Sequence, residues 1–318
     1  MIGYGNVARA LSRLLERKRA EFPFRIVGVN TLRHGTAYDP TGVPAEPVFG
    51  SAAASVEEFL DRAPSDAVVE LTTLNPATGE PALSHIKAAM RRGRHVVTAN
   101  KGPIAHAYAE LRDMARACGV EFRFESTVMD GAPVFNMVRD NLPGATVHGF
   151  TGVLNSTTKI VIDAMREGRT MDEGIEEARR LGITEADASY DIDGWDSAAK
   201  TAALANVFLD ARTNPLLVDR RGIGRLTPAR VAKLAAERKT VCLVSRAKRT
   251  QSGLRLRVRA EVLNDTDLLA SVRGTSNLIL FHTDLIGTVG TVSLSPGVEQ
   301  TAYGVFSDLV SVLKTVNR

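Results

Sequence analysis

Two charged residues four positions apart, Asp196 and Lys200, are the first candidates for chemistry in this sequence. They fall on a predicted helix from 196 to 209, so their side chains share one face. On spacing alone the pattern is typical of a surface ion pair, which stabilises a helix by about 0.3–0.5 kcal/mol. The neighbouring acids Asp191 and Asp193 favour a second interpretation. A lysine in a partly dry pocket can have a lowered pKa and act as a general acid or base.

A glycine-rich turn stands at the start of the sequence, where Gly3, Gly5 and Ala8 spell G-x-G-x-x-A. The first glycine permits a tight turn, the second lets a pyrophosphate approach the backbone, and the small third residue lets a helix pack closely on a strand. Alone this pattern is common in turns, but here an amphipathic helix follows directly. Its N-terminus would attract a phosphate. We therefore predict dinucleotide contacts from Gly3, Gly5, Asn6 and Val7.

The residues that close the next expected strand, 24–29, would contact the ribose of the dinucleotide. The segment VNTLRHG that ends it contains Arg33 and no acid. A carboxylate there would bind a ribose 2′-hydroxyl and select NAD, whereas a guanidinium suits a 2′-phosphate. We therefore expect NADP(H) to be favoured. NAD(H) is the alternative if Arg33 only lies in a solvated loop.

Only two residues, Met1 and Ile2, precede the glycine turn. In a doubly wound sheet the strand before this turn is central and needs about 5–6 residues. Met1 and Ile2 look like the last two of that strand, so we expect the true start of the protein to lie upstream. A truncated first strand would leave a gap at the centre of the sheet and weaken cofactor binding.

The elements that must position these residues follow two different patterns. Up to about residue 125, short apolar runs alternate with amphipathic segments, which predicts an α/β fold with a Rossmann-like, doubly wound parallel sheet. The expected strands are 24–29, 67–71, 95–98 and 121–125, and the expected helices are 8–18, 56–62, 80–92 and 108–118.

From about residue 131 the pattern changes to long helical stretches followed by strands, which predicts an α+β unit. The segment Leu254–Val262 alternates strictly, with Arg255, Arg257 and Arg259 on one face and apolar residues on the other. The expected helices are 158–167, 172–180, 196–209 and 301–316, and further strands are expected at 278–282 and 290–294.

Composition argues against several classes of protein. At 318 residues two domains are expected. A net charge of +4 with scattered arginines and 5% aromatic residues gives no reason to expect a nucleic-acid partner. No apolar run approaches the ~20 residues of a membrane helix, and no cleavable signal is recognisable. Cys118 and Cys242 lack ligand spacing, which suits a reduced cytoplasm and predicts neither a disulfide nor a zinc site.

Four stretches of the sequence, 70–105, 152–161, 181–200 and 297–309, resemble segments of the homoserine dehydrogenase family and occur in that family's order. The most specific motifs are TANK, which ends at Lys101, and DIDGWDSAAK, which ends at Lys200. The resemblance implies reversible NAD(P)-dependent interconversion of L-homoserine and L-aspartate 4-semialdehyde, a step in threonine, methionine and isoleucine biosynthesis.

The resemblance also implies roles for the charged residues. Lys200 would transfer the proton at the substrate oxygen, with Asp196 orienting it. Lys101, directly after a predicted strand, would polarise the carbonyl or relay a proton through water. Which of the two lysines makes the final transfer stays open. Glu185 would bind the ammonium group of the substrate, with Asp191 and Asp196 as supporting acids.

Further contacts follow from the resemblance alone. Thr72, Thr73 and Lys101 would contact the cofactor near its nicotinamide half, while Gly182 and Gly297 would approach it by their backbones. A monovalent cation, Na⁺ or K⁺, would bind main-chain carbonyls, supplied here by Glu125, Val128, Asp130 and Ala132. The sequence departs from the family at Ile183, where an aromatic residue is usual, and at Ser156, where glycine is common.

The implied organisation has three parts. A dinucleotide-binding domain would cover 1–130, a substrate-binding and dimerisation domain 131–296, and a C-terminal helix 297–318 would return to the first domain. We expect a cytoplasmic homodimer without the extra regulatory domain that some members carry. Two alternatives remain: another amino-acid dehydrogenase of the same architecture, and a non-catalytic dinucleotide-binding sensor. The presence of both lysines and their carboxylates speaks against the sensor.

Overall fold

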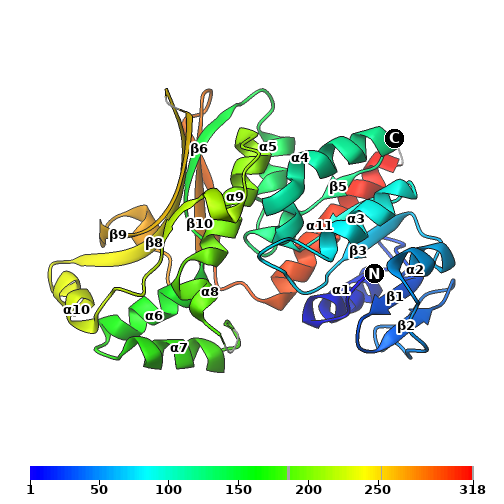
Figure 1. Ribbon diagram of the computed structural model, residues 1–318, viewed down its shortest axis with the longest axis horizontal. Helices are drawn as coiled ribbons and strands as arrows, with labels where there is room; N and C mark the ends of the chain where they lie inside the picture. The colour runs from blue at the N-terminus through cyan, green and yellow to red at the C-terminus, as the bar shows by residue number, and fades with distance from the viewer. Residues whose placement is uncertain (185–186, 252, 317–318) are drawn as a thin grey trace. The chain divides into compact units, whose positions relative to one another are not determined.

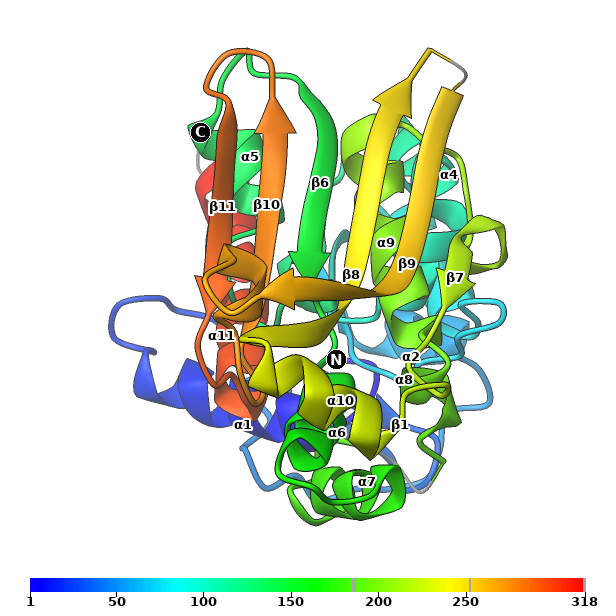
Figure 2. The same ribbon diagram turned by 90° about the vertical axis from the view of Figure 1, so that its left-hand side faces the viewer.

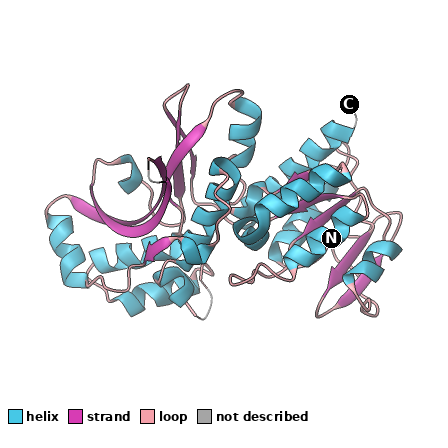
Figure 3. Cartoon of the chain, turned by 45° about the horizontal axis from the view of Figure 1, so that its top comes forward, coloured by secondary structure: helices cyan, strands magenta, loops and turns pink. Residues whose placement is uncertain are grey.

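The computed structural model describes residues 1–184, 187–251 and 253–316 (Figure 1). The chain divides into two compact units. The first consists of Met1–Arg139 together with Gly297–Arg318, and the second of Asp140–Pro296. Helices and short strands alternate in the first unit, whereas long strands dominate one side of the second (Figure 3). The mixed α/β class predicted from the sequence is confirmed.

A parallel sheet forms the centre of the first unit. Its strands β3 (Ala67–Glu70), β4 (His95–Thr98) and β5 (Phe122–Arg123) lie side by side in that order. Strand β1 (Gly28–Thr31) joins this sheet through Ile2, which forms parallel bridges with both Asn30 and Glu70.

Met1 and Ile2 therefore occupy the position where the sequence analysis expects a full central strand. The Ile2 N–H donates to the Val69 carbonyl (2.9 Å), and the Leu71 N–H donates to the Ile2 carbonyl (2.8 Å). On the other side the Asn30 N–H donates to the Met1 carbonyl (2.9 Å). The expected gap is thus bridged by two residues, and Ile2 is almost completely buried between its neighbours.

The strand predicted at 24–29 is different in the structure. It begins only at Gly28 and turns back through β2 (Gly35–Tyr38) as an antiparallel hairpin. Before Gly28 two carbonyls accept from residues after β2: that of Val27 from the Asp39 N–H (3.2 Å) and that of Ile26 from the Val43 N–H (2.7 Å). The aromatic rings of this segment pack on the last helix, with the ring centroids of Phe22 and Phe24 at 5.3 and 6.2 Å from that of Phe306.

Several helices of the first unit pack against this sheet. The helix α1 (Asn6–Arg17) presents Leu11, Leu14 and Leu15 at helical spacing to α11 (Val298–Val316) and the sheet. The others are α2 (Val56–Arg62), α3 (Ala82–Arg91), α4 (Lys101–Cys118) and α5 (Phe135–Asn141), with the 3₁₀ turn η1 (Glu125–Thr127). The predicted helix 108–118 is longer than expected, because α4 begins at Lys101 and kinks at Ala107.

A six-stranded sheet in the order β11-β10-β6-β8-β9-β7 forms the second unit (Figure 2). All neighbours are antiparallel except β7 and β9. The strands are β6 (Val147–Val153), β7 (Asp219–Arg221), β8 (Lys239–Thr250), β9 (Gly253–Asn264), β10 (Asn277–Thr283) and β11 (Thr288–Ser293). The alternation in the arginine-rich segment is confirmed, since Leu256 and Val258 are buried whereas Arg255 is exposed.

The described residues of the second unit include five helices, of which α9 packs against β6, β8 and β9 of the sheet. Their bounds are α6 (Ser156–Arg166), α7 (Met171–Arg180), α8 (Ser189–Ile192), α9 (Trp195–Leu209) and α10 (Pro228–Ala236). Two further 3₁₀ turns are η2 (Pro215–Leu217) and η3 (Leu268–Ala270). In the described part of the chain, every helix is too short or too polar to cross a membrane.

Candidate active site

The two glycines of the opening turn have different environments. Gly3 has φ +92°, and a Cβ placed on it would lie 2.5 Å from the Leu71 carbonyl oxygen, so only glycine fits. Gly5 is the exposed N-cap residue of α1 and leaves that helix end without a side-chain cap. A Cβ on Gly5 would meet nothing within 4 Å. The start of α1 is therefore an open set of backbone N–H groups, which fits a dinucleotide phosphate.

The third small residue of the turn, Ala8, is fully buried. It packs in a cluster with Tyr4 and with Val29 of β1. Asn6 is exposed and Val7 half-buried, so the first residues of α1 lie at the surface of the unit. The close helix–strand contact predicted for the third position is thus present.

Arg33 lies exposed in the turn between β1 and β2. This turn follows the end of β1, which is tied to the glycine turn by the Gly3 N–H donating to the Asn30 carbonyl (2.8 Å). The residues Gly28–Gly35 include no acid. The charged group available to a ribose after the end of β1 is therefore the Arg33 guanidinium.

A buried carboxylate that the sequence analysis did not single out organises the ends of β3 and β4. Glu70 is completely buried and accepts hydrogen bonds from the Thr72 N–H (2.8 Å), the Thr98 hydroxyl (2.8 Å) and the Thr72 hydroxyl. Burial raises the pKa of this carboxyl group, although the bonds from Thr72 and Thr98 oppose that shift. The signal in the sequence is an acid closing an otherwise apolar strand, AVVE.

Asn100 continues this network to Lys101. The Asn100 N–H donates to the Thr98 hydroxyl (2.9 Å), and its side-chain oxygen caps α4 by accepting from the Gly102 N–H (3.1 Å). Its side-chain amide also donates to the Thr72 carbonyl (3.3 Å). Lys101 is therefore the first residue of a capped helix at the carboxyl end of β4, where open α/β sheets bind ligands. Thr73 lies exposed in the loop after β3.

The loop that carries the predicted cation carbonyls is fixed to α11. Asp130 has φ +57° and accepts a hydrogen bond from the Thr301 hydroxyl (3.1 Å), while the Ser126 hydroxyl donates to the Thr301 carbonyl (2.7 Å). Two buried acids lie beside it. Burial raises the pKa of Glu125 to about 7 and also raises that of Asp308, whose carboxylate accepts from the Glu125 N–H (2.7 Å).

The predicted acid–base pair lies in the second unit and is mostly buried. The Lys200 Nζ is 3.1 Å from the Asp196 carboxylate, and it donates to the Leu154 carbonyl at 2.6 Å. The side chains are only 14% and 11% exposed, so this pair is not the solvated surface pair that spacing alone favoured. Both residues project from α9 towards the end of β6.

Asn155 connects this pair to Asp191. Its side-chain oxygen caps α6 by accepting from the Thr158 N–H (2.8 Å). Its amide nitrogen donates to the carboxylates of both Asp191 (2.6 Å) and Asp196 (2.9 Å). One amide therefore fixes two neighbouring carboxylates, a donor set that suits a cationic ligand group.

Two hydroxyls complete the environment of Asp191. Those of Thr157 and Thr184 donate to its second carboxylate oxygen at 2.8 and 2.9 Å. Asn155, Thr157 and Thr184 are not among the site residues predicted from the sequence. For Asn155 the available signal was an N-cap asparagine before an apolar helix, but its amide contacts depend on residues 36 and 41 positions away.

The structure thus brings together Asp191, Asp196 and Lys200 in the second unit.

The remaining predicted residues lie elsewhere. Gly182 is exposed with φ +68° and follows the end of α7, two residues before Thr184. Glu185 lies outside the described residues. In the first unit, Gly297 precedes α11 and its N–H donates to the Gln300 side chain (2.9 Å). Within residues 1–184, 187–251 and 253–316, no three His, Cys, Asp or Glu side chains form a metal centre.

Comparisons with known proteins give one consistent family. Residues 3–125 match the model described as homoserine dehydrogenase, NAD binding domain, and residues 133–310 match homoserine dehydrogenase. The NAD(+)-dependent homoserine dehydrogenase of Pseudomonas canavaninivorans is 32% identical over 339 residues, covering 100% of this chain and 96% of that protein. The homoserine dehydrogenase of Methanocaldococcus jannaschii is 31% identical over 339 residues, covering 100% and 99%.

Solved structures are similar over nearly the whole chain. The putative homoserine dehydrogenase from Archaeoglobus fulgidus has a TM-score of 0.87 at 26% identity, covering 98% of this chain and 97% of that one. A hyperthermophilic archaeal homoserine dehydrogenase in complex with NADPH has a TM-score of 0.82 at 28% identity, covering 99% and 96%.

Proposed function

The chain belongs to the homoserine dehydrogenase family, and from this premise we propose how its residues interconvert L-homoserine and L-aspartate 4-semialdehyde. It is an oxidoreductase that uses a nicotinamide dinucleotide. The observation that carries the proposed mechanism is the buried cluster of Lys200, Asp196, Asn155 and Asp191. It presents an amine and two carboxylates together, and homoserine offers an hydroxyl group and an ammonium group to match them.

In the proposed mechanism Lys200 moves the proton at the substrate oxygen. During oxidation its neutral amine accepts the hydroxyl proton, and during reduction its ammonium returns it. The bound nicotinamide supplies the hydride acceptor or donor. The Leu154 carbonyl and Asp196 hold the Lys200 Nζ in place, so the amine is positioned before substrate binds.

The acids would orient the substrate by its ammonium group. Asp191 is supported by Asn155 and by two threonine hydroxyls, which keep its carboxylate in one orientation. We propose Asp191 and Asp196 as partners of that ammonium, and Glu185 as a further one. We also propose that Lys101 polarises the substrate carbonyl or relays a proton. Its position at the start of α4, just after the end of β4, supports this role.

The direct test of this function is an assay of the purified protein with L-homoserine and each oxidised dinucleotide. The reverse reaction uses L-aspartate 4-semialdehyde with each reduced dinucleotide. We expect substrate-dependent change in the absorbance of the reduced nicotinamide in both directions. Turnover of a different amino-acid carbonyl in preference to the semialdehyde would contradict the proposed substrate.

For cofactor choice we propose a preference for NADP(H). Support comes from the exposed Arg33 after β1 and from the lack of an acid in Gly28–Gly35. The named relatives differ, since one is NAD(+)-dependent and one solved structure holds NADPH.

Replacing Arg33 with alanine should lower kcat/KM for NADP(H) by roughly 10- to 150-fold, because a charge-assisted contact to the 2′-phosphate contributes roughly 1.5–3 kcal/mol. The value for NAD(H) should change little. The measurement is the ratio of the two kcat/KM values in wild type and variant. An equal loss for both dinucleotides would show that Arg33 does not distinguish them.

The remaining proposals concern assembly and ions. We propose a homodimer formed through the substrate-binding region, 131–296. Residues 1–130 would bind the dinucleotide, and 297–318 would complete the dinucleotide-binding domain.

We also propose that Na⁺ or K⁺ binds the main-chain carbonyls of Glu125, Val128, Asp130 and Ala132. Oxygen donors suit such hard cations. The hydrogen bonds that tie this loop to α11 support the proposal, because they hold its carbonyls in a fixed arrangement.

A further inference from the structure

A second buried lysine lies beside the cluster and has no part in the mechanism described so far. Lys159, in the first turn of α6, is only 5% exposed. Its Nζ donates to the main-chain carbonyl of Asn155 and to the side-chain oxygen of Asn277, both at 3.0 Å. Neither acceptor carries a charge, although lysine is almost never buried without an ionic partner. This unusual burial needs an explanation.

The two lysines bind neighbouring peptide groups. Lys200 donates to the carbonyl of Leu154 and Lys159 to that of Asn155, so both amines converge on one turn between β6 and α6. Two ammonium groups this close repel each other, and burial makes the repulsion stronger. Lys159 also lies near the N-terminal end of α6, where the helix dipole disfavours a positive charge.

The hydrogen bonds of Lys159 match a neutral amine better than an ammonium. An ammonium offers three N–H donors and a neutral amine two. In the part of the chain that the structure describes, its Nζ has two acceptors. Desolvation, followed by the charge of Lys200, lowers the pKa of Lys159 to about 7. The other charged or titratable groups that act on it are Cys242 of β8, Asp163 of α6 and Asp196 of α9.

We propose that Lys159 is a positioning residue for the reaction, placed beside Lys200 so that the two amines share one positive charge. The shared proton can lie on either amine: beside Asp196 it is held on Lys200, and while it lies on Lys159, Lys200 is left as the neutral base that accepts the hydroxyl proton of homoserine. A single lysine would stay protonated near neutral pH, and a cationic neighbour is an established way to activate one. The proposal rests on the role of Lys200 proposed above.

The proton balance of this step is complete. The substrate O–H bond breaks, an N–H bond forms on Lys200, and the hydride passes to the nicotinamide. The doubly protonated pair then releases one proton to solvent, which is the proton that the overall oxidation produces. Because the two amines interact, their protons leave in two steps that belong to the pair and not to either residue alone.

The test is the pH dependence of kcat/KM for homoserine oxidation in wild type, Lys159→Met and Lys159→Gln. We expect the rise in activity to move to higher pH by about one unit or more in both variants, which lowers kcat/KM about tenfold near neutral pH. Glutamine keeps an N–H donor for Asn277 but no charge. A glutamine variant with the wild-type midpoint would mean that Lys159 acts only through its hydrogen bonds, and would overturn the proposal.

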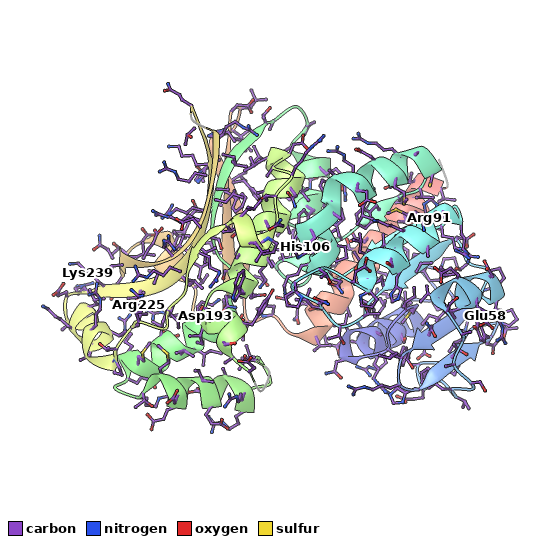
Figure 4. All side chains as sticks on the ribbon, in the orientation of Figure 1. Glu58, Arg91, His106, Asp193, Arg225 and Lys239 are labelled. Atoms are coloured by element: carbon purple, nitrogen blue, oxygen red, sulfur yellow. The ribbon has the colours of Figure 1, made fainter. Side chains whose placement is uncertain are left out.

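A matched control is Lys239→Met at the start of β8 (Figure 4). This change removes a partly exposed lysine whose partner is Glu237. The variant should keep the wild-type midpoint of the pH profile.

The pH dependence of stability provides a second test that does not require activity. Since the unfolded chain binds the proton that buried Lys159 releases, the wild-type free energy of unfolding should rise between about pH 7 and pH 10. Part of that rise should disappear in both Lys159 variants. If the free energy of unfolding rises with pH as steeply in the variants as in wild type, the shared charge is contradicted.

Failure of this inference is distinguishable from failure of the mechanism. If Lys200→Met turns over normally, the role of Lys200 is wrong and the proposal for Lys159 is wrong with it. If Lys200→Met is inactive while both Lys159 variants keep the wild-type midpoint, Lys200 is the base and only the shared charge is wrong.

Discussion

Replacing Lys200 with methionine should lower kcat for homoserine oxidation by roughly 10²–10⁴-fold, the usual contribution of a positioned general acid or base. Methionine has a similar length and keeps the packing of a side chain that is only 14% exposed. It has no proton to accept or donate, and the Leu154 carbonyl and Asp196 lose their contacts with the Lys200 amine. The loss should appear in single-turnover rates as well, since the chemical step itself is slowed.

The affinity for the dinucleotide separates this effect from unfolding or lost cofactor binding. The dissociation constant of the dinucleotide should stay near the wild-type value, because the glycine turn and Arg33 belong to the first unit. Turnover of the Lys101→Met variant is then compared with that of Lys200→Met to show which lysine makes the final proton transfer. If Lys101→Met shows the larger loss while Lys200→Met retains near-normal turnover, the final proton transfer belongs to Lys101 and the assignment made here is incorrect.

The sequence predicts best what depends on local spacing. Asp196 and Lys200 are four apart, so their shared helix face follows from helix geometry, and the structure places their charged groups 3.1 Å apart. The burial of that pair could not be predicted from spacing, because α9 packs against β6, β8 and β9, which lie far away in the sequence. The resemblance supplied what the spacing lacked.

Contacts that cross between elements were the ones missed. Glu70 reads as the end of a strand, and only the folded sheet brings Thr98 of the next strand to its carboxylate. Asn155 is recognisable as a helix cap, yet its bonds to two acids need α8 and α9 in place. Lys159 is not predicted as a site residue, because a single lysine in an apolar helix carries no sequence motif that indicates a role.

The short first strand shows a limit of a different kind. Periodicity predicted a strand at 24–29 from its apolar residues, but a strand also needs a partner along its length. Met1 and Ile2 supply pairing only as far as β1, and the earlier residues pack by their aromatic rings. Pairing is a tertiary property, and a single segment of sequence does not contain it.

The two glycines of the opening turn should give opposite results when each is replaced by alanine. At Gly3 the new Cβ would lie 2.5 Å from the Leu71 carbonyl oxygen, and φ is +92°. That neighbour is backbone at the centre of the sheet and cannot move aside. We expect Gly3→Ala to lower the free energy of unfolding by at least about 2 kcal/mol, combining backbone strain with overpacking. Chemical denaturation measures this directly.

At Gly5 the same change should spare the fold and impair cofactor binding. Its Cβ would meet no atom within 4 Å, and φ is −85°, which alanine adopts readily. The cost in stability should be below about 1 kcal/mol, as for a weaker N-cap residue. The methyl group would stand where a pyrophosphate approaches the start of α1, so we expect the dissociation constant of the dinucleotide to rise about tenfold, equivalent to about 1.4 kcal/mol. Titration calorimetry on both variants distinguishes the two roles, and wild-type affinity in Gly5→Ala would place the phosphate elsewhere.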